Sequence, residues 1–152
     1  MNQATETPAT GRHARPIVPF LRLGSNGEKP YLVAKKCGQC GAVYLGRRVA
    51  CSKCYATGPF EEIRLSDRGT LWVYSIVHQS APGIPTPYVA AIVDLPGGAS
   101  VRCTLIDVEP HAEQLQFGMP VEMVTKKVRE DKDGTDVIAF FFRPAGHEGL
   151  RA

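Results

Sequence analysis

The chain has 152 residues, of which 43% are hydrophobic and 22% are charged, and its formal net charge is +3. This length allows one modest globular domain with a small appendage, and no apolar run is long enough to cross a bilayer. A net charge this small does not by itself indicate nucleic-acid binding. Its distribution is uneven: through Arg68 there are eleven Lys or Arg against five Asp or Glu, and from Gly69 onward seven against ten.

Residues 1–16 lack the apolar segment of a secretory signal, and their polar composition predicts a disordered lead-in. Residues 17–58 are expected to form an N-terminal segment and a metal-binding ribbon. Within them, Pro19 to Leu23 is a short apolar patch that should dock on a neighbouring domain or on a partner. The missing export signal and the clustered thiols together favour a cytoplasmic location.

Four of the five cysteines form two Cys-x-x-Cys pairs, with ten residues between the pairs: Cys37, Cys40, Cys51 and Cys54. This spacing is typical of two turns that direct four sulfurs at one tetrahedral site, and a structural zinc is the expected occupant. Four thiolates leave no open coordination position, so the metal should not be catalytic. An element this small cannot bury its own core, and metal binding should supply on the order of 10 kcal/mol of its folding free energy.

Other uses of these cysteines remain open at this point. Two disulfides would need an oxidising compartment and would leave one cysteine over. A redox motif of the thioredoxin kind uses one Cys-x-x-Cys at the start of a helix. A rubredoxin-like iron site has the same four-sulfur geometry as a zinc site.

From residue 59 to residue 145 the pattern is that of strands, and a loose tail is expected from 146 to 152. Five strands are predicted with a helical turn at 110–115 after the third, which is the order of an OB-type barrel. The first of them is expected to be buried on much of both faces. The predicted strands are 70–77, 88–94, 100–106, 121–129 and 136–142.

Three features of the barrel could be mistaken for functional sites. Asp131 to Gly134 looks like the start of a calcium loop, but no glutamate closes it and no helices flank it, so it predicts a hairpin turn. Cys103 lies on the apolar face of a strand and is interpreted as a core residue, with a reactive thiol as the alternative. His78 is interpreted as a surface or interface residue in preference to a base. The sequence shows no convincing catalytic constellation.

Basic residues surround the cysteine pairs. Lys35 and Lys36 precede the first pair, and Arg47 and Arg48 lie between the pairs. They can form a solvated surface, or an electropositive patch that binds phosphate groups or an acidic partner.

The order of parts resembles the family of zinc-ribbon and OB-fold proteins associated with acyl-CoA metabolism. The resemblance covers about Tyr31 to Pro144, and a proline- and glycine-punctuated stretch replaces the helix that many members have ahead of the ribbon. It implies that the four cysteines are the metal ligands. The other matching positions are Gly69, Thr70, Tyr74, Pro87, Tyr88, Gly118, Met119, Val121, Phe142, Arg143 and Pro144.

Members of that family are typically encoded with thiolase-like or hydroxymethylglutaryl-CoA-synthase-like enzymes. The resemblance therefore implies a non-catalytic subunit of a thiolase-fold enzyme, acting with it on a bulky or aromatic 3-oxoacyl-CoA such as benzoylsuccinyl-CoA. Subunits of sterol side-chain enzymes are a second possibility. In this interpretation Lys35, Lys36, Arg47 and Arg48 hold coenzyme A, whose phosphates they would pair with. Trp72 and the loop Pro82 to Tyr88 are expected at the protein interface.

Two other classes of function compete with this one. Zinc ribbons and OB folds also bind single-stranded nucleic acid, but the second and third barrel strands should then interleave basic and aromatic residues. Tyr88 to Ile106 offers one Arg and one Tyr. The third class is a stand-alone enzyme that uses Cys103. The sequence thus favours an accessory subunit that binds no nucleic acid and no membrane.

Overall fold

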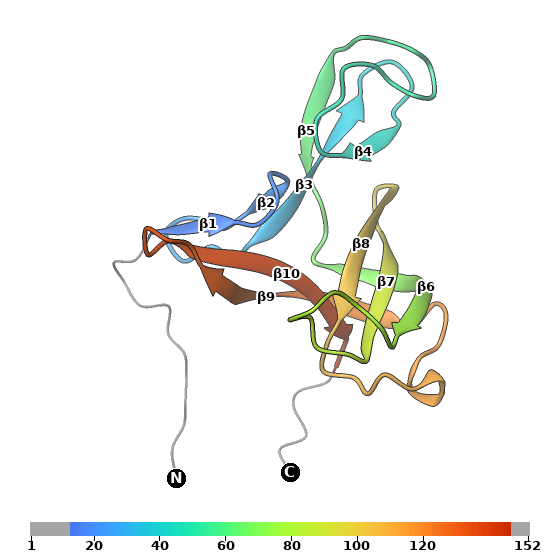
Figure 1. Cartoon of the computed structure of the whole chain (residues 1–152). Helices are drawn as coiled ribbons and strands as arrows, with labels where there is room; N and C mark the ends of the chain where they lie inside the picture. Colours follow the sequence, from blue (N-terminus) through green and yellow to red (C-terminus); the bar gives the residue numbers. More distant parts are fainter. Residues whose placement is uncertain (1–12, 147–152) are drawn as a thin grey trace.

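The computed structural model describes residues 13–146, which form strands and one short 3₁₀ helix. Figure 1 shows a barrel from which a narrower ribbon projects. In the described part of the chain no helix is long and apolar enough to span a membrane. The elements are β1 (Ala14–Pro16), β2 (Leu21–Arg22), β3 (Tyr31–Cys37), β4 (Val43–Leu45), β5 (Phe60–Arg64), β6 (Arg68–Val77), β7 (Tyr88–Leu95), β8 (Ala99–Leu105), η1 (Ala112–Gln114), β9 (Pro120–Glu130) and β10 (Asp136–Pro144).

Strands β6 to β10 form the barrel. The pairing order is β10-β8-β7-β6-β9, and β9 also pairs with β10, so the sheet closes on itself. The 3₁₀ helix η1 follows the third of these strands. This confirms the mainly β fold with a five-stranded OB-type barrel, and the five predicted strands match β6 to β10 to within two residues at each end.

The barrel owes its core to alternation along its strands. In β7 every second residue is buried, beginning with Val89, because successive side chains of a strand point to opposite faces of the sheet. Phe142 is 0% exposed and lies at the point where β10 reaches β8, opposite Leu105. Gly69 permits a close crossing, since a Cβ there would overlap the Asp94 carbonyl oxygen.

The prediction that the first barrel strand is buried on both faces is wrong. In β6 only Leu71 is fully buried, and Trp72 and Val73 are 56% and 37% exposed. The pairing of β6 with β7 shifts register between Leu71 and Val73, and such a bulge turns the extra side chain outward. The apolar side chains of this strand therefore lie on the outer surface of the barrel as well as in its core.

The ribbon is built on β3, which pairs with both β4 and β5. The predicted barrel region begins at residue 59, but Phe60–Arg64 forms β5, which lies opposite β3, with Phe60 facing Cys37 across the ladder. The ribbon sheet therefore runs to Arg64, and the chain enters the barrel at about Leu65. Between the cysteine pairs, Val43–Leu45 forms β4, whereas Val49 is 80% exposed and lies outside the strands.

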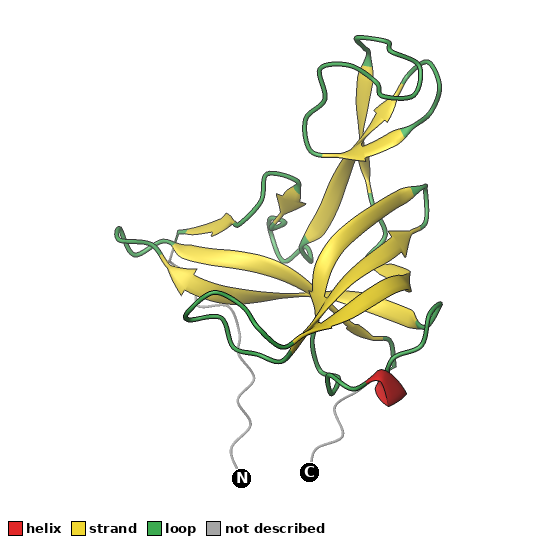
Figure 2. Cartoon of the chain, turned by 45° about the vertical axis from the view of Figure 1, so that its right-hand side comes forward, coloured by secondary structure: helices red, strands yellow, loops and turns green. Residues whose placement is uncertain are grey.

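The apolar patch at residues 19–23 docks within this chain. Leu21 is 0% exposed and belongs to the common core, and the ring of Phe20 meets that of Phe140 edge-on at 6.0 Å. Figure 2 shows this segment beside the long hairpin of β9 and β10. The patch thus joins the base of the ribbon to the barrel.

The N-terminal lead-in differs from the prediction in its last residues. Ala14–Pro16 forms β1, which pairs in parallel with the start of β10, and Arg15 makes an ion pair with Asp131 at 2.6 Å. The sequence of β1 has no apolar alternation, so only its neighbour in space could reveal it. The predictions for residues 1–12 and 147–152 lie outside the described residues.

Candidate metal centre

The two Cys-x-x-Cys turns have the same backbone structure. They are the first turn (Cys37–Ala42) and the second turn (Cys51–Ala56). In each, the N–H of the first cysteine donates to the carbonyl of the residue five positions later, at 2.8 Å. The N–H of the residue four positions later donates back to the cysteine carbonyl, at 2.9 Å. The two turns are therefore copies of one structure facing a common point.

Each turn places one residue in the left-handed region of the backbone. In the first turn this residue is Gly41, with φ of 73°, which glycine adopts without strain. In the second it is Tyr55, with φ of 62°, and its side chain is 81% exposed. A glycine marks the first of these positions in the sequence, whereas the tyrosine at the second gives no such signal.

The four sulfurs converge at the far end of the ribbon. The Sγ atoms of Cys37 and Cys54 are 3.7 Å apart, those of Cys40 and Cys51 are 3.5 Å apart, and all four lie within 4.8 Å of one another. A tetrahedral metal with sulfur bonds of 2.3 Å requires sulfurs about 3.8 Å apart. The cluster therefore fits a four-sulfur metal site, and all five cysteines of the chain are free thiols.

Hydrogen bonds to the sulfurs favour ionised thiols. The N–H groups of Cys40 and Gln39 lower the pKa of Cys37. The hydroxyl of Tyr44 is the main cause that lowers the pKa of Cys51 to about 6. The N–H of Ala56 acts in the same direction on Cys54, but burial and the neighbouring thiols raise the pKa of Cys54 to about 12. Thiolates this close repel one another, so a divalent cation would supply the missing opposite charge.

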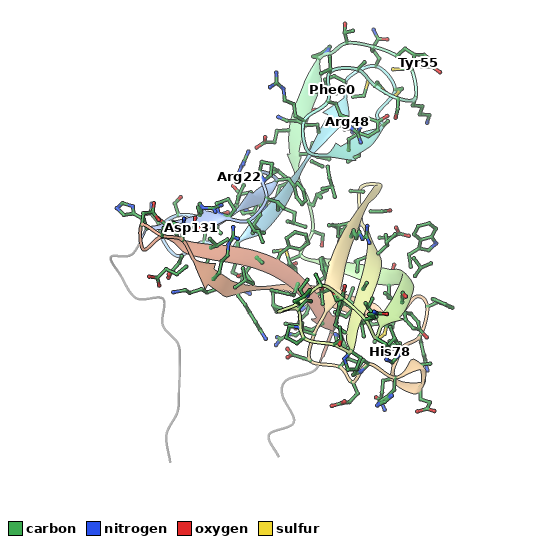
Figure 3. All side chains as sticks on the ribbon, viewed as in Figure 1. Arg22, Arg48, Tyr55, Phe60, His78 and Asp131 are labelled. Carbon is green, nitrogen blue, oxygen red and sulfur yellow. The ribbon has the colours of Figure 1, made fainter. Side chains whose placement is uncertain are left out.

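The four predicted basic residues do not form one patch. Lys35 and Lys36 are neighbours on β3 and point to opposite faces: Lys35 lies beside Glu62, with 3.1 Å between Nζ and Oε2, and Lys36 lies on the other face. The guanidinium of Arg48 lies 4.7 Å from the centre of the Tyr44 ring. Figure 3 shows Arg48 on the ribbon, well away from Arg22 at its base.

Lys35 and Arg47 both line a hollow at the base of the ribbon with a volume of about 410 Å³. Arg22 of β2 also lines it, and Glu62 accepts hydrogen bonds from both Arg22 and Lys35. These contacts lower the pKa of Glu62, Lys35 being the larger cause. Sequence reasoning missed Arg22, because its place in this hollow depends on the pairing of β2 with β3. The full lining is Pro19, Phe20, Arg22, Val33, Ala34, Lys35, Gly46, Arg47 and Glu62.

A second concave surface lies on the barrel, where β10 diverges from β8. It has a volume of about 710 Å³ and is mainly apolar, and Arg102 is the basic residue of its described lining. A channel for single-stranded nucleic acid, by comparison, combines several cations with stacking aromatics. The residues that line this concave surface of the barrel are Ile17, Gly83, Ile84, Pro85, Tyr88, Ala90, Arg102, Cys103, Thr104, Val128, Ala139, Phe140 and Phe141.

The remaining candidates are three exposed histidines and one largely buried cysteine. His13, His78 and His111 are exposed, and His147 lies outside the described residues. Burial raises the pKa of Cys103 to about 12, which keeps its thiol protonated and unreactive near neutral pH. The candidate interface residues are exposed: Trp72 on the bulge of β6 and Ile84, at 51%, in the loop before β7.

Comparison with known proteins places these features in a family. Residues 62–126 match the family described as "ChsH2, C-terminal OB-fold domain". A DUF35 domain-containing scaffold protein of Methanocaldococcus jannaschii is 37% identical over 120 residues, which are 77% of this chain and 84% of that protein. Its counterpart in Methanothermobacter thermautotrophicus is 35% identical over 143 residues, 92% of this chain and 97% of the other.

Two further similarities involve subunits of enzymes. The benzoylsuccinyl-CoA thiolase subunit BbsA of Thauera aromatica is 29% identical over 124 residues, 82% of this chain and 83% of that protein. Among solved structures, the "Ltp2-ChsH2(DUF35) aldolase" matches with a TM-score of 0.61 and 23% identity over 76% of this chain and 85% of the other. At that identity the structural match shows the shared fold.

Proposed function

Because this chain belongs to the family of DUF35 domain-containing scaffold proteins, we propose that it is a non-catalytic subunit of a thiolase-like acyl-CoA enzyme. The observation that carries the proposal is the similarity to benzoylsuccinyl-CoA thiolase subunits over 82% of this chain, and the match to scaffold proteins over 92% of it agrees with a non-catalytic role. The site supports it, because no described group is arranged as a nucleophile with its base. The catalytic residues would then belong to a thiolase-fold partner, and this chain would assist assembly and acyl-CoA binding.

The metal in this proposal is a structural zinc held by Cys37, Cys40, Cys51 and Cys54. With four sulfurs it has no position for water or substrate, so it contributes cross-linking and charge to the ribbon and no reaction step. Iron would fit the same four sulfurs. Elemental analysis of the purified chain tests the assignment: about one zinc per chain is expected, and iron at that stoichiometry would overturn it.

The hollow at the base of the ribbon is the proposed site for the nucleotide end of coenzyme A. Arg22, Lys35 and Arg47 carry three positive charges against the single carboxylate of Glu62. Cations in a partly enclosed hollow bind phosphate through charge-assisted hydrogen bonds. Phe20 and Val33 provide an apolar wall beside them. Of the four residues predicted from the sequence, the proposed site uses Lys35 and Arg47, and it adds Arg22, because these three line the hollow.

Calorimetry of coenzyme A with the assembled complex tests this site. We expect Arg47→Ala to weaken binding by about tenfold, the effect of losing one charged hydrogen bond. Lys36→Ala is the matched control, because it removes the same charge from the opposite face of β3 and should leave the affinity unchanged. Equal affinities of the two variants would contradict the assignment.

The reaction class is proposed to be thiolytic cleavage of a bulky or aromatic 3-oxoacyl-CoA. Its support is the similarity to subunits named for benzoylsuccinyl-CoA thiolase in two organisms. Expression of this chain with tags, followed by identification of the untagged protein that co-purifies, tests the partnership. A thiolase-fold partner whose thiolysis rate depends on this chain is expected. Activity of the partner that is the same without this chain would contradict an accessory role.

A further inference from the structure

The surroundings of the four sulfurs are less symmetric than the backbone that carries them. Each turn directs backbone N–H groups at its own first sulfur, as the N–H of Lys53 does at 3.4 Å from Cys51 Sγ. Cys51 Sγ has an additional neighbour, the hydroxyl of Tyr44, at 3.2 Å. In the described part of the chain this is the side-chain hydroxyl that contacts the sulfur cluster. Among the four cysteines, Cys51 is thus the one whose sulfur contacts a side-chain hydroxyl of the described residues.

The direction of this hydrogen bond follows from its neighbours. Ser52 Oγ donates to the oxygen of Tyr44 at 3.0 Å, so the tyrosine proton is free to point elsewhere. A sulfur bound to metal is a thiolate and can only accept. Tyr44 therefore donates to Cys51, and Ser52 holds the hydroxyl in the orientation that does so. The result is a chain of contacts from Ser52 through Tyr44 to the metal ligand.

Arg48 covers the other side of the same tyrosine. Its guanidinium lies 4.7 Å from the ring centre, within the range of a cation–π contact. A cation over the ring face withdraws electron density from the hydroxyl and makes it a stronger donor. The ring itself is fixed by its place in β4, opposite Lys35 of β3. Backbone, serine and arginine together hold the tyrosine in one position.

We propose that Tyr44 is a positioning residue of the metal centre, which stabilises the Cys51 thiolate as a ligand and slows release of the metal. Groups that hydrogen-bond to metal ligands orient them, and their loss typically weakens metal binding by about 10- to 100-fold. Ser52 and Arg48 act through Tyr44 and not on the sulfur. This role concerns the metal centre of the ribbon and stands apart from any role in acyl-CoA binding.

The test compares Tyr44→Phe with Tyr55→Phe. Both changes remove one hydroxyl from a tyrosine near the cluster, but Tyr55 is 81% exposed and projects from the second turn. Tyr44→Phe keeps the ring beneath Arg48 and so isolates the hydroxyl. Transfer of zinc from the purified chain to a chromogenic chelator should be about tenfold faster in Tyr44→Phe, and unchanged in Tyr55→Phe.

A spectroscopic measurement distinguishes this role from a merely structural one. With cobalt(II) in place of zinc, a hydrogen bond to the thiolate lowers the energy of its electrons and moves the sulfur-to-cobalt charge-transfer band to higher energy. Tyr44→Phe should therefore shift this band to lower energy. Ser52→Ala should shift it in the same direction by less, and should add nothing in the Tyr44→Phe background.

Two results would overturn the proposal. One is a charge-transfer band and a transfer rate in Tyr44→Phe equal to those of Tyr55→Phe. The other is faster zinc transfer with an unchanged band, which would show that the hydroxyl supports the fold without acting on the sulfur. Should Tyr44→Phe fail to fold, the exposed Ser52→Ala variant carries the same test, and an unshifted band there would count against the proposal.

Discussion

The ribbon and the barrel are both small β structures, but they are held together by different forces. The barrel buries a contiguous set of apolar side chains, which includes Val93, Val101, Val121 and Phe142 at 0% exposure. The outer part of the ribbon, residues 37–60, buries only two residues, Cys37 and Cys51, at 1% each. A hydrophobic core stabilises the barrel and the base of the ribbon, whereas the outer part of the ribbon depends on its sulfur cluster. The outer part of the ribbon and the barrel should therefore respond independently to loss of the metal and to damage to the core.

The largest effect is expected from Cys37→Ser. The change removes a buried ligand, and a structural four-sulfur site contributes on the order of 10 kcal/mol to the fold around it. Amide hydrogen exchange should then show loss of protection in residues 37–60, while β6 to β10 stay protected. Chelation of the metal should have the same result in the unchanged chain. Loss of protection throughout the barrel would refute the independence of the two regions.

Cys103 of the barrel and the four cysteines of the ribbon should differ in their reactivity. Burial raises the pKa of Cys103 to about 12, so at pH 8 its thiolate fraction is roughly a thousandfold below that of a free cysteine. After metal removal, iodoacetamide should modify the four ribbon cysteines and leave Cys103 unmodified. Mass spectrometry of the alkylated chain measures this difference, and rapid modification of Cys103 would contradict it.

The burial of Cys103 also predicts a pH dependence. Because burial favours its neutral thiol, the free energy of unfolding should fall above about pH 9, where the thiol of the unfolded chain ionises.

Damage to the barrel core should destabilise the barrel and leave the metal centre intact. Phe142 closes the barrel between β8 and β9, facing Leu105 on one side and Met123 on the other. Phe142→Ala should lower the free energy of unfolding by about 3 to 5 kcal/mol, because it removes buried apolar surface and leaves a cavity. Urea denaturation measures the loss. Below the transition, the zinc content should remain that of the unchanged chain.

The same contrast explains what the sequence could predict. The five barrel strands and the helical turn were predicted because alternation and turn residues are local signals. The convergence of four sulfurs followed from their spacing. The places of β1, β2 and β5 depend on strands distant in the sequence, and the bulge at Trp72 breaks the alternation on which the burial prediction relied. The roles of Arg22 and Tyr44 likewise come from neighbours that a linear pattern does not contain.

The smallest effect is expected from a substitution in the second turn of the ribbon, which can be compared with the first turn. They share their hydrogen bonds, but the left-handed position is Gly41 in the first turn and Tyr55 in the second. A non-glycine residue in that conformation costs about 1 kcal/mol. Tyr55→Gly should therefore stabilise the second turn, because the exposed tyrosine side chain contributes little packing in return, although glycine also loses more entropy on folding. Slower zinc transfer to a chelator, by at most about fivefold, is the expected result. Gly41→Tyr should have the opposite effect. Faster transfer in Tyr55→Gly would show that the tyrosine side chain contributes to the metal centre after all.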